Sequence, residues 1–430
     1  MARSLVVFED EEFSRLYPLT LTRPAWDLIC GIQRLKEKLL WGLQAAAIAQ
    51  VAWRDFAGDR LGLHFHSRGY LAGGYRGAVE SYKLVGRGSR LVSLVNGRLL
   101  FDRKLIDNVD PSWEGKYVNR GSVVWANMPV ERLEGLETYL GRPIPRDFFA
   151  DIETKVLDAR LIRRPWDLIK LNGREIERDF NLLGGQVVES APPAGVYIIG
   201  EDRMRMGRSV RLSPGVVIDA AAGPVSIESD VTVMANASLQ GPVHIGRGSV
   251  VKMGAKIYGE TTIGPRCKVG GEVAESILQG YTNKQHDGFL GHSYLGEWVN
   301  LGAGTDTSDM KNNYSTVRVG PPGSEEDTGE IFVGLFMGDH SKSGIGTVFN
   351  TGTLVGVCCS IFGAGYPPKF MPSFVWGGSG GFEGYDPERA IQTAAKVMAR
   401  RDKKLSPEGE AMLKTIYELT ADDRRAFLGP

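Results

Sequence analysis

An aliphatic residue recurs at every sixth position between residues 227 and 269, and this repeat constrains the fold more than any other feature of the sequence. The repeating positions are Ile227, Val233, Leu239, Ile245, Val251, Ile257, Ile263 and Val269. Each six-residue unit holds one short strand and one turn, so three units make one coil of about eighteen residues. Side chains one coil apart then stack on the same face. The repeat therefore predicts a left-handed parallel β-helix, a prism with an aliphatic column at its centre.

The alternative for such a run is a sandwich of ordinary short strands. Sandwich strands alternate apolar and polar residues with period two, and they do not keep a six-residue register over so long a segment. The glycines favour the prism as well. The chain has 55 glycines, well above the average share of about 7%. Gly248 and Gly254 stand where a coil needs a tight turn.

Composition and charge exclude several classes of protein. Lys plus Arg and Asp plus Glu both number 51, so no basic surplus favours a nucleic-acid partner. The N-terminal sequence lacks the pattern of a signal peptide, and no apolar run approaches the ~20 residues of a membrane span. We therefore expect no nucleic acid and no membrane among the partners. The four cysteines show no metal-ligand spacing and are expected to be reduced thiols of a cytoplasmic protein: Cys30, Cys267, Cys358 and Cys359.

The chain is long enough for more than one domain, since 430 residues exceed the ~150 of a typical domain. We expect an α/β, Rossmann-like domain with a helical connector over residues 1–190. The β-helix follows over residues 191–380 and a helical tail over residues 381–430. Pro192 and Pro193 mark the first boundary, because adjacent prolines stand in turns and linkers.

The connector at the end of the first domain has a mostly helical pattern over residues 146–183. Pro165 and the pair Asn172–Gly173 are expected to break it, because proline and glycine disfavour a helix interior. The elements expected before the connector are strands at 4–8 and 90–95 and a helix at 32–50.

The six-residue register is lost after the first coils. We expect an irregular stretch over residues 272–313, followed by a polar loop over 321–330. The repeats resume over residues 345–362, and the prolines within 367–372 are expected to close the prism. The tail helix should begin at residues 386–388, where Asp precedes Pro and Glu in the pattern of a helix N-terminus.

Function in a regular β-helix is expected from insertions into its wall. The stretch 284–305 is such a candidate, since it carries His286 and His292, two of the six histidines of the chain. Lys284 and Tyr294 lie in the same stretch. The sequence therefore predicts an acid–base site in this segment.

Residues 291–296, with the sequence GHSYLG, and residues 299–305, with the sequence VNLGAGT, carry a family resemblance. Together with Asn313 and Tyr314, they resemble the acetyltransferase half of the bifunctional enzymes that make UDP-N-acetylglucosamine. Those enzymes join a glucosamine-1-phosphate acetyltransferase to an N-acetylglucosamine-1-phosphate uridylyltransferase. The whole chain is most similar to an alternative bacterial branch of that family, described as sugar nucleotidyltransferases.

The resemblance implies acyl transfer from acetyl-CoA to an acceptor sugar, with His292 as the general base. His292 would take the proton from the attacking amine or hydroxyl, and the unperturbed pKa of histidine, about 6.5, suits that role. By the same resemblance, Tyr294 and Asn300 would orient the acceptor and the oxyanion. The residues that would hold sugar and phosphate are Lys284, Lys311, Asn313, Tyr314 and Lys342.

A second histidine is a rival for the general base. His340 stands beside Asp339 and near Lys342, in a phrase that recurs in the same branch. The sequence also departs from the bifunctional enzymes, because His292 and Tyr294 are two residues apart where those enzymes have three. Their upstream pair of lysines has no match in residues 273–276. The identity of the base and of the acceptor therefore stays open.

Residues 15–20, with the sequence RLYPLT, resemble the end of the signature loop of sugar-1-phosphate nucleotidyltransferases. In that family a glycine-rich loop comes first and cradles the nucleotide phosphates. Here residues 8–14 carry four carboxylates, which would repel a triphosphate unless Mg²⁺ intervened. The residues that would bind nucleotide are Arg15, Arg23 and Asn96, and Asp102 would bind the metal. An active domain and one that has lost its chemistry both remain open.

The sequence thus predicts a two-domain enzyme of nucleotide-sugar biosynthesis, with an α/β nucleotidyltransferase-like domain fused to a hexapeptide-repeat acyltransferase. Its partners would be a sugar phosphate and an NTP, and the resemblance implies a homotrimer. The alternatives are a sugar-1-phosphate nucleotidyltransferase alone, or a non-catalytic regulatory or scaffold protein that binds a nucleotide sugar.

Overall fold

The computed structural model describes residues 3–56, 61–71, 90–184 and 193–429. The chain forms two compact units. The domain boundaries expected from the sequence stay predictions. The first unit comprises Met1–Leu28, Gln33–Arg164 and Pro407–Met412, and the second comprises Ile29–Ile32, Pro165–Ser406 and Leu413–Pro430.

The first unit is an α/β domain around a six-stranded sheet with the strand order β4-β1-β5-β8-β7-β9. The two strands expected at 4–8 and 90–95 are confirmed as β1 and β5, which pair in parallel. β4 pairs in parallel with β1, and β8 pairs antiparallel with β5. The strands are β1 (Arg3–Phe8), β3 (Gln33–Arg34), β4 (Leu61–His66), β5 (Leu91–Asn96), β6 (Leu99–Leu100), β7 (Gly115–Asn119), β8 (Ser122–Pro129), β9 (Thr154–Val156) and β10 (Arg160–Leu161).

Both faces of this sheet are buried, which explains why β1 is apolar at successive positions. Leu5 and Val7 belong to one hydrophobic cluster, whereas Phe8 belongs to the cluster on the opposite face. The helix expected at 32–50 is confirmed as α1, whose Leu39 and Leu43 pack with the first cluster. The helices are α1 (Leu35–Ala49) and α2 (Arg103–Asn108), with 3₁₀ turns at Glu11–Leu16, Ala25–Asp27, Val51–Phe56, Val130–Tyr139 and Arg146–Phe149.

The connector differs from the expected broken helix. Between residues 146 and 164 only one short 3₁₀ turn and two short strands form, and a single α-helix, α3 (Pro165–Leu182), follows without a break. Pro165 begins this helix, where a missing N–H costs nothing. Gly173 does not end it but allows close packing, because a Cβ there would lie 2.4 Å from Glu260 Cγ.

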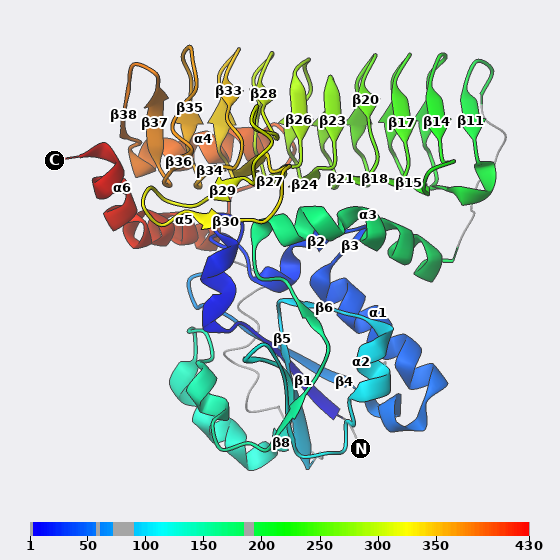
Figure 1. Cartoon of the computed structure of the whole chain (residues 1–430), viewed down its shortest axis with the longest axis vertical. Helices are drawn as coiled ribbons and strands as arrows, with labels where there is room; N and C mark the ends of the chain where they lie inside the picture. Colours follow the sequence, from blue (N-terminus) through cyan, green and yellow to red (C-terminus); the bar gives the residue numbers. More distant parts are fainter. Residues whose placement is uncertain (1–2, 57–60, 72–89, 185–192, 430) are drawn as a thin grey trace. The chain divides into compact units, whose positions relative to one another are not determined.

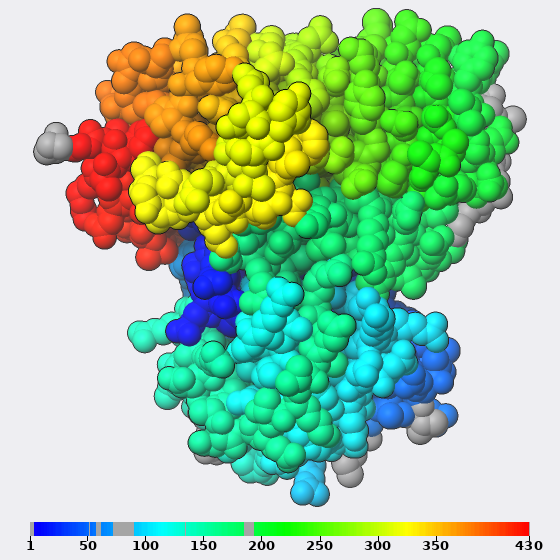
Figure 2. Space-filling model, in the orientation of Figure 1, coloured from blue at the N-terminus to red at the C-terminus, as the bar shows by residue number. Residues whose placement is uncertain are grey.

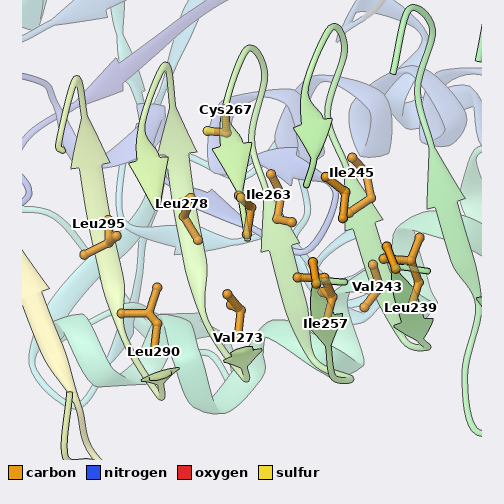
Figure 3. Packing of buried hydrophobic residues seen from close by; sticks show 14 of the residues in the cluster. Leu239, Val243, Ile245, Ile257, Ile263, Cys267, Val273, Leu278, Leu290 and Leu295 are labelled. Atoms are coloured by element: carbon orange, nitrogen blue, oxygen red, sulfur yellow. The ribbon is translucent and has the colours of Figure 1, made fainter. Parts of the chain in front are cut away.

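The second unit contains the predicted prism. Its strands form parallel ladders in which Ile227 pairs with Ile245 and Ile245 with Ile263, as the six-residue repeat requires. Leu239 likewise pairs with Ile257 on another face. Figure 3 shows Ile245 and Ile263 in one column inside the prism and Leu239 and Ile257 in another. Burying one such side chain stabilises the fold by about 1.5–3 kcal/mol, so the columns are the main source of its stability.

The prism has three faces built from β-sheets, and Figure 1 shows their strands side by side. The first face is built from β11 (Tyr197–Ile199), β14 (Val217–Asp219), β17 (Ser238–Gln240), β20 (Lys256–Ile257), β23 (Glu272–Ala274) and β26 (Phe289–Gly291). The second face is built from β12 (Met204–Met206), β15 (Val225–Ile227), β18 (Val243–Ile245), β21 (Thr261–Ile263), β24 (Ile277–Gly280), β27 (Tyr294–Glu297), β31 (Leu335–Met337), β34 (Thr353–Val355) and β36 (Phe370–Met371).

The third face consists of two ladders, and a further pair of strands lies next to β26. The third-face strands are β13 (Arg211–Leu212), β16 (Thr232–Val233), β19 (Val250–Val251), β22 (Lys268–Val269), β25 (Asn283–Lys284), β32 (Lys342–Ser343), β35 (Ser360–Ile361), β37 (Val375–Gly378) and β38 (Gly381–Gly384). The additional pair is β28 (Asp306–Thr307) with β33 (Val348–Phe349).

The prediction of an irregular stretch at 272–313 is wrong for most of these residues. The coils continue through it, since Leu278 pairs with Ile263 and Leu295 with Leu278. The register was hidden because these coils are shorter and because Lys284 occupies the inward position that Val269 holds one coil earlier. Residues 284–305 are therefore wall and not insertion.

The insertion lies further along, between β28 and β31. It contains a hairpin of β29 (Arg318–Val319) and β30 (Glu326–Asp327), in the part coloured yellow that protrudes from the prism in Figure 2. The repeats resume at β31 rather than at residue 345, and they run past the prolines to β37, with which β38 pairs antiparallel.

α3 lies along the second face, below β15 to β24 in Figure 1. The short strand β2 (Ile29–Cys30) also contacts β24 of this face. The helical tail is confirmed, since α4 (Pro387–Ala399) begins after Asp386, whose carboxylate accepts a bond from the Arg389 amide. α5 (Pro407–Leu419) and α6 (Ala421–Leu428) follow. In the described ranges, we find no helix with the length and apolar character needed to cross a bilayer.

Candidate functional site

The corner between the first and second faces places three ionisable residues in successive coils. Glu260, Glu275 and His292 each follow a strand of the first face and precede one of the second. All three have the left-handed conformation, with φ of +54°, +46° and +44°. The amide of His292 donates to Ala274 O, and the amide of Glu275 donates to Gly259 O. The coil ladder thus holds a conformation that costs an isolated side chain about 1–3 kcal/mol.

The insertion leaves the prism from the same corner, and its two ends form walls beside His292. Asp309 Oδ2 lies 2.8 Å from His292 Nδ1, and the Phe332 ring stacks on the imidazole at 5.0 Å between centroids. The Val333 amide donates to Asp309 O, and the Gly334 amide donates to His292 O. The backbone therefore fixes Asp309, Phe332 and His292 relative to one another.

The other nitrogen of His292 also has a carboxylate partner. Its Nε2 lies 2.5 Å from Glu275 Oε2. Burial opposes the charged ring, but the hydrogen bonds to Asp309 and Glu275 outweigh it and raise the pKa of His292 to about 9. The imidazole is thus cationic at neutral pH in this arrangement. The Glu275 side chain is 44% exposed and that of Asp309 only 15%, so Glu275 is the more easily displaced partner.

A cavity of about 670 Å³ opens beside this corner, between α3 and the first-face strands. Its lining residues are Gly173, Arg174, Glu177, Ala222, Gln240, Gly241, Pro242, Tyr258, Gly259, Glu260, Glu272, Ala274 and Glu275. Burial, together with the nearby Glu275, raises the pKa of Glu260. The volume of the cavity is that of a small-molecule site. The partly buried carboxylates give the cavity an acidic wall.

The side chains of Tyr294 and Asn300 make their hydrogen bonds away from His292. The Tyr294 side chain is fully buried on the second face, where its hydroxyl donates to Gln279 Oε1 at 2.5 Å and accepts from the Ile29 amide at 3.0 Å. Asn300 lies in line with the third-face strands, and its Oδ1 accepts from Asn283 Nδ2 at 3.3 Å. Their placement does not support the expected role in orienting acceptor or oxyanion.

The rival base, His340, lies at the corner between the second and third faces. Its ring stacks at 6.2 Å on Trp298, which stacks in turn on Tyr281 at 4.3 Å. His340 is 7% exposed, and its carbonyl accepts from Lys342 Nζ at 2.7 Å. Burial lowers the pKa of Lys342. This arrangement is a packed column of rings, and His340 fits a role in packing better than one in proton transfer.

The expected ligands for sugar and phosphate are dispersed. Lys284 points into the prism, donates to Gly270 O and His286 O, and has its pKa lowered to about 8 by burial. Lys311 and Asn313 lie on the insertion and bond within their own loop, to Thr316 O and to the Ser315 amide and hydroxyl. Tyr314, at 69% exposure, is open to a ligand.

In the first unit, arginines neutralise the carboxylates that follow β1. Arg68 binds Glu9 through two bonds of 3.0 Å, and the Arg68 and Glu9 side chains are 4% and 0% exposed. Arg98 binds Asp10 at 2.5 and 2.8 Å and Glu12 at 2.9 Å. The expected repulsion of a triphosphate is therefore largely cancelled by arginines distant in sequence.

The expected nucleotide ligands take different positions around this cluster. Arg15 is half-exposed and 3.9 Å from Glu12. Arg23 is buried, 4.0 Å from Asp27. The Asn96 side chain donates to Asp10 Oδ2 and Val123 O, which places it at the carboxyl end of β5. Ligands bind at this edge in open α/β sheets.

Asp102 does not fit the expected Mg²⁺ site. Its carboxylate caps α2 by accepting from the Lys104 amide at 3.1 Å. In the part of the chain that the structure describes, no group of three His, Cys, Asp or Glu side chains is arranged to hold a metal.

The chain joins two kinds of unit. One is an α/β unit with charged groups at the carboxyl end of its sheet, and the other is a β-helix that carries a histidine paired with carboxylates. Residues 5–186 match the family model described as sugar nucleotidyl transferase. The bifunctional sugar-1-phosphate nucleotidylyltransferase/acetyltransferase of Sulfurisphaera tokodaii is 30% identical over 203 residues, covering 47% of this chain and 44% of that protein. The bifunctional protein GlmU of Methylococcus capsulatus is 33% identical over 130 residues, covering 29% and 27%.

The chain spans less than half the length of these curated relatives. Among solved structures, the UDP-N-acetylglucosamine acyltransferase of Arabidopsis is 12% identical with a TM-score of 0.26, and the match covers 54% of this chain and 94% of that one. The resemblance found in the sequence is confirmed by the family match and by the bifunctional relatives.

Proposed function

We propose that the protein is an enzyme of nucleotide-sugar biosynthesis that transfers an acyl group from acetyl-CoA to an amino-sugar phosphate at the His292 corner. The observation that carries this proposal is the imidazole fixed between Asp309 and Glu275 at the edge of a cavity of about 670 Å³. A histidine oriented by a partly buried carboxylate, whose other nitrogen contacts a displaceable group that lines a cavity, is the arrangement of a general base.

In the proposed reaction, Asp309 accepts the Nδ1–H bond and so leaves Nε2 as the basic nitrogen. The ring first loses its Nε2 proton to solvent, and the acceptor displaces Glu275 from Nε2. The free Nε2 then takes a proton from the attacking amine or hydroxyl. A bond forms between that atom and the thioester carbonyl carbon, and the carbon–sulfur bond breaks. The proton passes from the imidazolium to the departing thiolate, so that free CoA and the acylated sugar are released.

The test is release of free CoA from acetyl-CoA in the presence of glucosamine phosphate. We expect thiol release that depends on the acceptor. If thiol release does not depend on any acceptor in a panel of amino-sugar phosphates and nucleotide sugars, the proposal fails and the non-catalytic alternative is favoured. Thermal shifts with NTPs, sugar phosphates and acyl-CoAs then show which of them the scaffold binds.

A second activity, nucleotidyl transfer from an NTP to a sugar-1-phosphate, is favoured by the family match over residues 5–186. Arg15 is half-exposed beside the arginine-neutralised cluster, so it can meet a phosphate. We expect Arg15→Ala to abolish pyrophosphate exchange, because it removes a cation that faces the phosphates. Assays with and without Mg²⁺ measure the dependence on metal. A wild-type protein without exchange for any NTP plus Mg²⁺ would mean that this unit has lost its chemistry.

We also propose a homotrimer in the cytoplasm. The resemblance supports the trimer, and the prism leaves apolar side chains exposed along its walls, such as Met253, Tyr258 and Ile345. The four cysteines are buried thiols, which is typical of a reducing compartment. Light scattering at micromolar concentration checks the trimer, and a monomer there would count against active sites shared between subunits.

A further inference from the structure

A second cavity, of about 580 Å³, lies at the start of the prism and at a different corner from His292. It is formed where the second face turns into the third. Its lining residues are Arg205, Met206, Gly207, Arg208, Ser209, Ser229, Asp230 and Arg247. Three arginines and two serines thus line one space, and Asp230 is the acidic residue among them.

The coil register explains why these side chains meet. Met206 pairs with Ile227 and Ile227 with Ile245, so the residues two positions further on, Arg208, Ser229 and Arg247, form one column. Neighbouring strands of a sheet lie about 4.8 Å apart, which places the Cα atoms of Arg208 and Arg247 about 10 Å apart with Ser229 between them.

Gly207 lets the coils approach closely at this point. A Cβ there would lie 2.5 Å from the Ser229 amide nitrogen and 2.8 Å from its Oγ, so a larger residue would press against Ser229. The chain turns at Ser209 and Asp230, which have φ of +58° and +65°. The cavity is therefore a product of the coil geometry.

The charge of the cavity favours an anion. Arg205, Arg208 and Arg247 face a single lining carboxylate, Asp230. Glu228 lies just outside the lining, and its Oε2 accepts from the Arg247 amide at 2.8 Å. Among the residues that the structure describes, no carboxylate lies within ion-pair distance of the Arg205 or Arg247 guanidinium. A cluster of guanidinium groups in a concave site attracts phosphate and binds it through paired N–H donors.

We propose that this cavity binds the diphosphate group of a small molecule, with Arg208 and Arg247 on its two phosphates and the Ser229 hydroxyl between them. A diphosphate fits better than a single anion because the two arginines are two coils apart. The volume of about 580 Å³ leaves room for a group attached to the diphosphate, since small-molecule sites range over ~300–1,000 Å³. The site is independent of the acyl transfer proposed at His292.

The test is calorimetric titration of the full chain with inorganic pyrophosphate, UDP and UDP-N-acetylglucosamine, which separates free pyrophosphate from a diphosphate that carries a nucleoside. We expect the double variant Arg208→Ala/Arg247→Ala to weaken binding of the favoured probe by ~10²-fold or more, because two charged hydrogen-bond donors are lost. Raised NaCl should weaken wild-type binding as well.

The matched control is Arg211→Ala, an exposed arginine of the same coil that lies outside the cavity lining. It should bind like wild type. If the double alanine variant does not fold, Arg208→Lys/Arg247→Lys replaces it and should weaken binding by ~10-fold, since lysine lacks the paired donors. The proposal is overturned if none of the three probes binds, if the double variant keeps wild-type affinity, or if Arg211→Ala weakens binding equally.

Discussion

The acidic cluster after β1 and the corner around His292 both pair cations with carboxylates, but they differ in how firmly the partners are held. Arg98 is 1% exposed, and it also donates to Ile162 O, so Asp10 and Glu12 bind a cation that cannot leave. His292 instead has one fixed partner, Asp309, and one half-exposed partner, Glu275. A fully satisfied ionic network stabilises a fold, whereas an ion pair with one displaceable member leaves a group available for chemistry.

The largest expected effect concerns His292. His292→Ala should lower the kcat of acyl transfer by ~10²–10⁴, the usual contribution of a positioned general base. Binding of acetyl-CoA should change little, because the base faces the acceptor. Steady-state kinetics with thiol detection measures the first effect and calorimetry the second.

The controls for this variant are His286→Ala and His340→Ala. His340→Ala should lower the melting temperature, because it removes a ring from a buried stack, while kcat stays within a few-fold of wild type. An inactive His340→Ala beside an active His292→Ala would show that the general base has been assigned to the wrong corner.

The second large effect is a loss of stability, and it is expected in the acidic cluster after β1. Arg98→Ala leaves Asp10 and Glu12 without their buried cation, and breaking such a pair destabilises a protein by about 3–5 kcal/mol. Glu275→Gln should cost under ~1 kcal/mol at neutral pH, because Glu275 is half-exposed. Denaturant unfolding of both variants measures the contrast, and equal losses would remove the distinction drawn between the two regions.

Asp309→Asn should lower kcat by roughly 10-fold or more, since Asp309 positions the ring and stabilises its charge. The pKa of His292 should also fall, because Asp309 is a principal cause of its rise. A variant that lost stability without moving the pH profile would indicate a purely structural role. Asp309→Glu serves as the conservative comparison.

The pH dependence of the rate tests Glu275. The kcat/KM of acyl transfer by the wild type should rise with pH through a single ionisation near the free-enzyme His292 pKa of about 9, because only the neutral ring accepts a proton. Glu275→Gln removes one of the two carboxylates that raise this pKa, so the midpoint should move to lower pH while the plateau rate changes little. A midpoint that does not move would mean that Glu275 does not hold Nε2 in the free enzyme.

A further effect is the pH dependence of stability. The folded pKa of His292, about 9, is above the unfolded value of about 6.5. The stabilisation is therefore complete below pH 6.5 and lost as pH rises through 9. The difference between these two pKa values, about 2.5, sets an upper limit of ~3.4 kcal/mol. The stabilisation is smaller than this limit because solvent screens the half-exposed Glu275. Unfolding free energies measured from pH 6 to 10 should decline for the wild type and decline less for His292→Gln.

Much of the prism could be predicted from the sequence, because an aliphatic residue at every sixth position leaves little choice of fold. The ladder pairs Ile227, Ile245 and Ile263 in the register that the repeat requires. The same logic failed after Ile263, where the coils shorten and Lys284 replaces an aliphatic residue inside. A periodic signal is lost when the period changes, although the fold continues.

The candidate site was only partly predictable. His292 stood out by residue type, but its partners did not, although the segments at 259–263, 274–278 and 291–295, with the sequences GETTI, AESIL and GHSYL, are related. Aligning these segments would have placed Glu260 and Glu275 in the coils before His292. Asp309 and Phe332 carry no such signal, because they come from the two ends of an insertion that only the folded chain brings together.

The sequence by itself determined the architecture, since the period of the repeat and the apolar strands specify which side chains are buried. Tertiary structure decided the chemistry. Whether the four carboxylates after β1 repel a phosphate depends on Arg68 and Arg98, and whether His292 is neutral depends on Glu275 and Asp309. The physical reason is that burial follows from local patterns, whereas charge and pKa depend on distances of a few ångströms between residues far apart in the chain.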